Sequence, residues 1–140
     1  MNKVVLITGA SSGFGHSTAK YLISKGYTVY GTSRKEMTDS SIKMIRMDVC
    51  DKVSVNTAVD YIQEKEGRID VLINNAGMGI GGCIELATDE EIDIQMDTNF
   101  RGMSNVCQCV LPGMRKQRSG KIINISSIYC YFIIISHSIP

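Results

Sequence analysis

A glycine-rich turn directly behind an apolar strand pattern is the feature that most constrains how this chain folds. The turn, residues 8–15, reads TGASSGFG and follows the apolar residues 4–7. Because a helical pattern comes next, free backbone N–H groups and the positive end of a helix dipole meet at the turn. Glycines at 9, 13 and 15 let the chain turn sharply, let a pyrophosphate approach the backbone, and let helix and strand pack closely. The turn therefore predicts a site for the phosphates of a nucleotide.

Strand and helix patterns alternate along the chain. Short apolar, β-branched runs predict strands at residues 3–8, 27–33, 42–47, 69–73 and 121–125. The second and third strands are too close in sequence for a full crossover helix, so we expect a turn or a single helical turn between them. The alternation predicts an α/β fold of Rossmann type, a doubly wound parallel sheet of about five strands.

Three helices are expected, each with its own boundary signals. The first follows the glycine turn and ends at Gly26. The second begins after Asp51 as N-cap and ends at Gly67. The third is long and begins at a capping box formed by Thr88 and Glu91. Its apolar residues are expected to form one stripe: Ile92, Met96, Phe100, Met103, Cys107, Val110 and Met114.

Composition excludes several classes of protein. The 140 residues suffice for one domain with a core, and the net charge of +1 gives no basic surface for nucleic acid. No apolar run approaches the roughly 20 residues of a membrane span, and no signal-peptide pattern is present. The five cysteines have neither CxxC nor zinc spacing, so no metal site is expected and they are interpreted as reduced thiols. We therefore expect a cytoplasmic protein without membrane or nucleic-acid partners.

Polar residues follow the second strand, at the edge of the sheet where ligands bind. An acidic residue here would hold the ribose hydroxyls of NAD, whereas an arginine accommodates the 2′-phosphate of NADP. Arg34 occupies this place, with Ser33 as a second donor, which favours NADP(H) over NAD(H). The alternative is a solvated surface arginine. Lys35 either assists or is simply exposed, and His16 is interpreted as a half-exposed helix residue, with phosphate contact as the alternative.

The later strands also end in polar or small residues. Asp48 and Val49 end the third strand, where a carboxylate can accept from the adenine amino group. The NNAG segment at 74–77 ends the fourth, and its small residues let ribose and adenine lie against the backbone. Asn99 is a poor helix former in mid-helix, which indicates either a surface position or a polar group that serves the cleft.

Five ordered motifs resemble the short-chain dehydrogenase/reductase family in its classical form: TGASSGFG at 8–15, DV at 48–49, NNAG at 74–77, TNFRG at 98–102 and INISS at 123–127. The resemblance covers about residues 1–128, a dinucleotide-binding Rossmann-type domain, and leaves residues 129–140 as a divergent apolar tail. It implies an NAD(P)-dependent oxidoreductase that moves hydride between nicotinamide and a carbonyl or secondary alcohol. A small-molecule substrate and a family-like homo-oligomer go with it.

The turn, the strand ends and the resemblance together give a set of site residues. By the resemblance, Asn99 helps to hold a water relay and Ser127 donates a hydrogen bond to the substrate's oxygen. The expected cofactor-binding residues are Thr8, Gly9, Ser11, Ser12, Gly13, Phe14, Gly15, Ser33, Arg34, Asp48, Val49, Asn75, Ala76 and Gly77.

The resemblance also implies an acid–base tyrosine thirteen residues beyond the serine, followed four residues later by a lysine. Pro140 stands at that position, and neither Tyr129 nor Tyr131 has a lysine four residues later. Either one of these tyrosines substitutes, or the sequence diverges just after Ser127 or Ile128, as a truncation or change of frame would produce. The second interpretation is favoured. The alternative to an active enzyme is then a catalytically inactive nucleotide-binding fragment or a partner-binding module.

Overall fold

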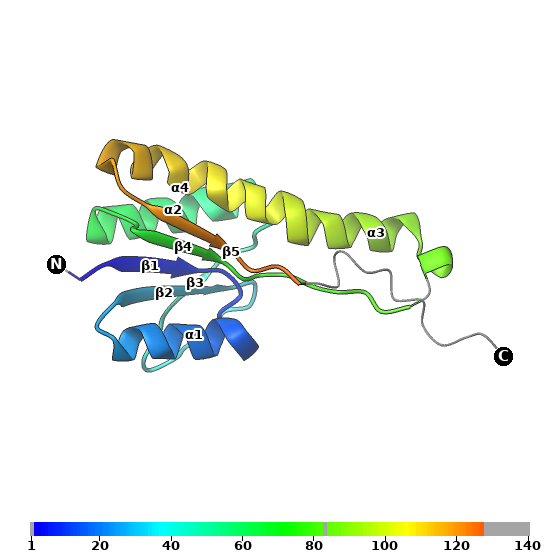
Figure 1. Cartoon of the computed structure of the whole chain (residues 1–140), viewed down its shortest axis with the longest axis horizontal. Helices are drawn as coiled ribbons and strands as arrows, with labels where there is room; N and C mark the ends of the chain where they lie inside the picture. The colour runs from blue at the N-terminus through cyan, green and yellow to red at the C-terminus, as the bar shows by residue number, and fades with distance from the viewer. Residues whose placement is uncertain (1, 83, 128–140) are drawn as a thin grey trace.

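Within the described residues, five parallel strands form one sheet with helices on both faces (Figure 1). The computed structural model describes residues 2–82 and 84–127. The strand order is β3-β2-β1-β4-β5, which confirms the predicted doubly wound sheet. The strands are β1 (Val4–Ile7), β2 (Thr28–Ser33), β3 (Lys43–Arg46), β4 (Val71–Asn74) and β5 (Lys121–Asn124). The expected divergent tail, residues 129–140, lies outside the described residues.

The central strand β1 is buried on both sides, because helices cover both faces of the sheet around it. Leu6 faces the cluster that α2 (Lys52–Glu66) and α4 (Met103–Gln117) cover. Its neighbour Ile7 faces the opposite cluster, which α1 (Gly13–Ser24) covers. Helix α1 packs through the small residues Gly15 and Ala19, so helix and sheet approach closely.

The predicted helix boundaries are confirmed where a local signal marks them. The Asp51 carboxylate accepts from the Val53 N–H at 2.9 Å at the start of α2, and Gly67 ends that helix in the left-handed conformation. Thr88 and Glu91 form the expected reciprocal capping box at the start of α3 (Asp89–Met96). A short 3-10 helix, η1 (Ile84–Leu86), precedes it.

The long third helix differs from its prediction. It consists of α3, a π-helical turn η2 (Asp97–Gly102) and α4. Its second half supplies Val106, Val110 and Met114 to the core, but in the first half Ile92, Met96 and Phe100 are exposed. The expected single stripe is therefore wrong for that half. Helix α3 extends beyond the end of the sheet, so the sheet does not cover it (Figure 1). The π turn also changes the helical period.

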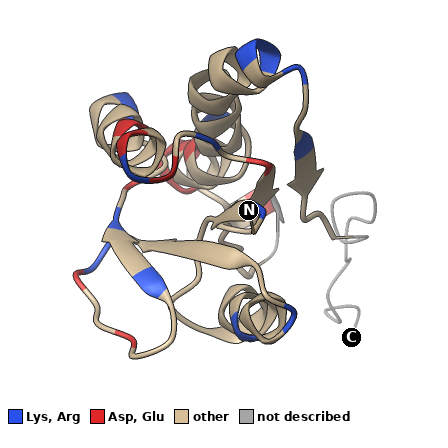
Figure 2. Ribbon diagram, turned by 90° about the vertical axis from the view of Figure 1, so that its left-hand side faces the viewer, with Lys and Arg blue, Asp and Glu red and all other residues tan. Residues whose placement is uncertain are grey.

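Charged residues of both signs are interspersed over the helices and loops in the view of Figure 2, in keeping with the net charge of +1.

The connection between β2 and β3, residues 34–42, contains bends and no helix, as its length predicts. Within the described residues, no helix is both long enough and apolar enough to cross a membrane.

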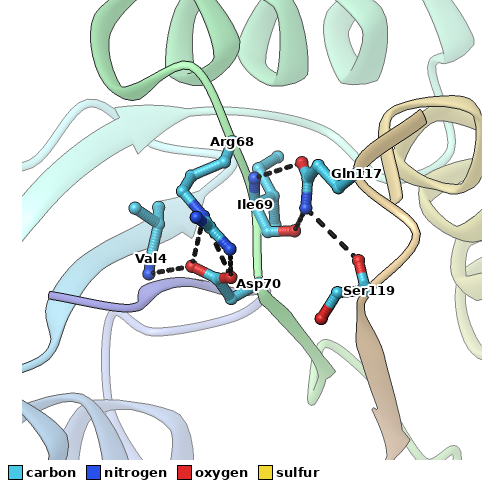
Figure 3. A network of polar contacts seen from close by, with 6 residues as sticks. All are labelled: Val4, Arg68, Ile69, Asp70, Gln117 and Ser119. Carbon is cyan, nitrogen blue, oxygen red and sulfur yellow. Dashed lines mark hydrogen bonds and ion pairs between the residues drawn. The ribbon is translucent and has the colours of Figure 1, made fainter. Parts of the chain in front are cut away.

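A buried carboxylate joins the amino-terminal ends of β1 and β4, opposite the edge where ligands bind in such sheets (Figure 3). Asp70 accepts from the Val4 N–H at 2.8 Å, and both of its oxygens contact Arg68. Burial alone would raise the pKa of this carboxyl, but Arg68 and the Val4 amide outweigh burial and hold the pKa below its ordinary value. Asp70 therefore stabilises the fold as a carboxylate.

The same region is tied to α4 through Gln117 (Figure 3). Its side-chain oxygen accepts from the Ile69 N–H at 3.2 Å, and its amide donates to the Ile69 carbonyl at 3.1 Å. The amide also donates to the Ser119 carbonyl at 3.3 Å. These bonds fix the end of α4 beside the start of β4.

We expect Asp70→Asn to lower the free energy of unfolding by about 2 kcal/mol at pH 7, because charged hydrogen bonds to Arg68 and Val4 are weakened. The folded pKa lies below the unfolded value of about 3.9, so this stabilisation is present above that pH and is lost as the pH falls below it. Denaturant unfolding at several pH values measures the difference. Asp60→Asn, on the exposed side of α2, is the matched control, and an equal loss in both variants would contradict the assignment.

Candidate functional site

A cleft of about 570 Å³ lies at the carboxyl edge of the sheet, where the glycine turn meets the ends of β2, β3 and β4. Many of the residues predicted from sequence line it. They are Gly9, Ser11, Ser12, Ser33, Arg34, Asp48, Val49, Asn75, Ala76 and Gly77. The structure thus brings residues from four separate segments of the chain to one cavity.

The other predicted residues lie outside the lining of this cleft. Thr8 and Gly15 are buried beneath it, whereas the Phe14 side chain is 87% exposed. Gly13 starts α1 with open space around the position of a side chain. Ser127 is exposed and follows β5 at the same edge of the sheet.

The sequence patterns do not predict all of the lining residues. Lys35 has two interpretations from sequence, and the lining residues without a predicted role are Thr32, Met47, Cys50, Met78 and Thr98. Met78 directly follows the NNAG motif and Thr98 is the first residue of TNFRG, and these positions are the signal that could have found them. Met47 and Met78 resemble ordinary core residues in sequence, because methionine fills irregular apolar space.

The NNAG segment is clamped on to the glycine turn by four hydrogen bonds. The Thr8 hydroxyl accepts from the Asn75 and Ala76 N–H groups at 3.0 and 2.9 Å. The Asn75 side-chain amide donates to the Thr8 and Gly9 carbonyls, both at 3.0 Å. A side chain on Gly9 would lie 2.8 Å from the Ala76 Cα, so this contact requires a glycine. The two motifs therefore form one rigid wall of the cleft.

The first turn of α1 differs from those of α2 and α3 in how its N–H groups are satisfied. Its N-cap, Ser12, makes no side-chain capping bond, and the turn contains no acidic residue. Asp51 caps α2, and three acidic residues follow the capping box of α3. An uncapped helix N-terminus beside a cleft fits an anionic ligand such as a phosphate.

Two cationic residues line the cleft where β2 ends. Arg34 and Lys35 are exposed, and the Lys35 N–H donates to the Ser33 hydroxyl at 3.2 Å in a tight turn. At the end of β3, Asp48 accepts from the Cys50 N–H at 2.9 Å, and its own N–H donates to Ser54 at 3.0 Å. Positive charge thus lies at the end of β2 and a fixed carboxylate at the end of β3.

Asn99 lies in the π turn η2, not in a regular helix. Its side-chain oxygen accepts from the Met78 N–H at 2.9 Å, and its amide donates to the Met78 carbonyl at 2.7 Å. Because both polar groups of the side chain bond to the segment after NNAG, Asn99 fixes that segment against the long helix. A π turn is a frequent feature of functional sites.

The residues present fit a dinucleotide. The uncapped helix and the glycine turn suit the pyrophosphate, and the wall formed by Gly9, Ala76 and Gly77 leaves the backbone open to a flat ring or sugar. Across residues 2–82 and 84–127, no three His, Cys, Asp or Glu side chains come together as a group that could hold a metal.

A parallel doubly wound sheet with a glycine turn and a cleft at its carboxyl edge defines a dinucleotide-binding α/β protein. The family model described as short chain dehydrogenase matches residues 3–138. The chain belongs to this family of oxidoreductases.

Relatives support the same assignment. Over 127 residues the chain is 58% identical to the 3-ketodihydrosphingosine reductase of Bacteroides thetaiotaomicron, covering 90% of this chain and 47% of the relative. It is 38% identical to the 3-oxoacyl-[acyl-carrier-protein] reductase FabG of Thermotoga maritima, over 90% of this chain and 56% of the relative. The solved structure of ElxO with NADP bound superimposes with a TM-score of 0.88 at 33% identity, over 94% of this chain and 58% of that one. The chain spans about half the length of these relatives.

Proposed function

We propose that this chain is the cofactor-binding part of a reductase that uses NADPH to convert a 3-oxo group to an alcohol. The observation that carries the cofactor preference is the pair of cations, Arg34 and Lys35, at the end of β2 in the cleft. The substrate class rests on the relatives, since the names of the two reductases above both specify a 3-keto or 3-oxo compound. A structure with NADP bound among the neighbours adds support for the cofactor.

Each part of the site has a role in this proposal. The N–H groups of the glycine turn and of α1 bind the pyrophosphate, and Arg34 with Ser33 binds the 2′-phosphate. Asp48 accepts from the adenine amino group, while Asn75, Ala76 and Gly77 form the wall beside the sugar. When bound, the cofactor supplies the hydride.

The substrate's side of the reaction is assigned to two residues. Ser127 donates a hydrogen bond to the substrate's oxygen, which stabilises the charge that develops there. Asn99 helps to hold a water relay, and its bonds to Met78 keep that part of the helix in place.

A second candidate is a nucleotide-binding module without turnover. It is favoured by one observation in the sequence: no lysine follows Lys121 within the 140 residues, so the tyrosine and lysine that the family resemblance implies are not both among them.

Titration of the purified chain with NADPH and with NADH, with binding measured by fluorescence, tests the proposal. A turnover assay with 3-ketodihydrosphingosine and a 3-oxoacyl thioester follows. We expect NADPH to bind at least about tenfold more tightly than NADH. Turnover then supports the reductase, and binding without turnover supports the module. Equal affinity for the two cofactors, or binding of neither, would contradict the cofactor assignment.

A further inference from the structure

The connection between β2 and β3 holds the cations of the cleft, yet it has no helix to pack it against the sheet. Residues 34–42 contain bends and no helix or strand, and Arg34 and Lys35 begin this segment. A crossover between parallel strands ordinarily includes a helix that fixes it to the sheet. The position of the two cations therefore depends on individual side-chain contacts within the connection.

Asp39 is the centre of those contacts. One carboxylate oxygen accepts from the Ser41 N–H at 2.8 Å, the Ser41 hydroxyl at 2.7 Å and the Ile42 N–H at 3.2 Å. These bonds, those from Ser41 first, hold the pKa of Asp39 well below its ordinary range. Ile42 is buried in the core cluster beneath α1, so this end of the connection is anchored.

The second oxygen of Asp39 reaches outside the connection. It lies 3.1 Å from Nε2 of His16, which is in the first turn of α1 directly after Gly15. His16 is only partly exposed, with 29% of its side chain accessible. The backbone N–H of His16 donates to the Ser12 carbonyl at 3.3 Å. The hydrogen bond between His16 and Asp39 thus joins the cation-bearing connection to the helix whose N-terminus faces the cleft.

We propose that the His16–Asp39 contact sets cofactor specificity by holding residues 34–42 against α1, so that Arg34 and Lys35 face the 2′-phosphate of NADPH. This inference rests on the proposed function. Neither His16 nor Asp39 lines the cleft, so both are positioning residues. Because the 2′-phosphate is the feature that distinguishes NADPH from NADH, loss of the contact weakens NADPH binding selectively.

The test compares His16→Leu, which removes the bond to Asp39, with His16→Gln, which retains a donor. Ser17→Ala, an exposed neighbour on α1, is the matched control. We expect His16→Leu to raise the Kd for NADPH about fivefold and to change the Kd for NADH less than about twofold. His16→Gln restores most of the affinity for NADPH. Asp39→Ala gives a similar selective loss, and the double variant with His16→Leu loses less than the two single effects combined.

Three results separate this inference from the proposed function. Failure of the unmodified chain to bind NADPH more tightly than NADH would contradict the proposed function itself. Preference for NADPH that His16→Leu and Asp39→Ala leave unchanged would overturn only the positioning contact. Equally weakened binding of NADPH and NADH in these variants would also overturn the positioning contact, because that pattern indicates a general loss of structure at α1.

Discussion

Gly15→Ala is expected to abolish measurable cofactor binding and to lower the free energy of unfolding by about 2 kcal/mol. A methyl group at this position would lie 2.5 Å from Nδ2 of Asn75 and closer still to the Gly9 carbonyl oxygen. Both contacts belong to the wall formed by the glycine turn and the NNAG segment. The helix would have to move away from β1, and its N-terminal N–H groups would move away from the cleft with it.

Two measurements check this expectation: cofactor titration and denaturant unfolding of the same variant. Gly79→Ala is the matched control, because its added methyl group meets nothing within 4 Å and its backbone is not left-handed. The control should retain both stability and binding. Normal binding by Gly15→Ala would show that the close approach of α1 to the turn is not required for the site.

Gly15 also shows what the sequence can predict. The spacing of the three glycines predicts close packing of helix on strand, and the buried position of Gly15 agrees with it. Strands, caps and the carboxyl-edge cleft follow from local patterns of the same kind, because each signal lies within a few residues. One of the two groups that make Gly15 necessary, the Asn75 side chain, is 60 residues away and has no local signal.

The predictions that failed depended on which surface covers an element. The apolar residues Ile92, Met96 and Phe100 have the spacing of a buried stripe, but α3 extends past the sheet and leaves them exposed (Figure 1). Periodicity reports which side of a helix is apolar and not what packs against it. The contact between His16 and Asp39 is similar, since an irregular connection has no period from which to predict it.

Arg34→Ala is expected to raise the Kd for NADPH about thirtyfold and to leave the Kd for NADH nearly unchanged. Hydrogen bonds to a charged group contribute about 2 kcal/mol, and this variant removes those that Arg34 would donate to the 2′-phosphate. Lys35→Ala should have a smaller effect, because a lysine offers no bidentate geometry. Parallel titrations with both cofactors, at one stated ionic strength, measure the change in selectivity.

A charge reversal at Arg34 tests the binding of the 2′-phosphate at the end of β2 more strictly. Arg34→Asp should repel the 2′-phosphate and provide an acceptor for the ribose hydroxyls, so the preference should invert toward NADH. Arg115→Ala, in the last turn of α4 and outside the lining of the cleft, changes the net charge as much as Arg34→Ala does and serves as its control. If Arg115→Ala and Arg34→Ala weakened the binding of NADPH equally, the loss of affinity would come from the change in net charge. If Arg34→Asp still preferred NADPH, the end of β2 would not be the place where the 2′-phosphate binds.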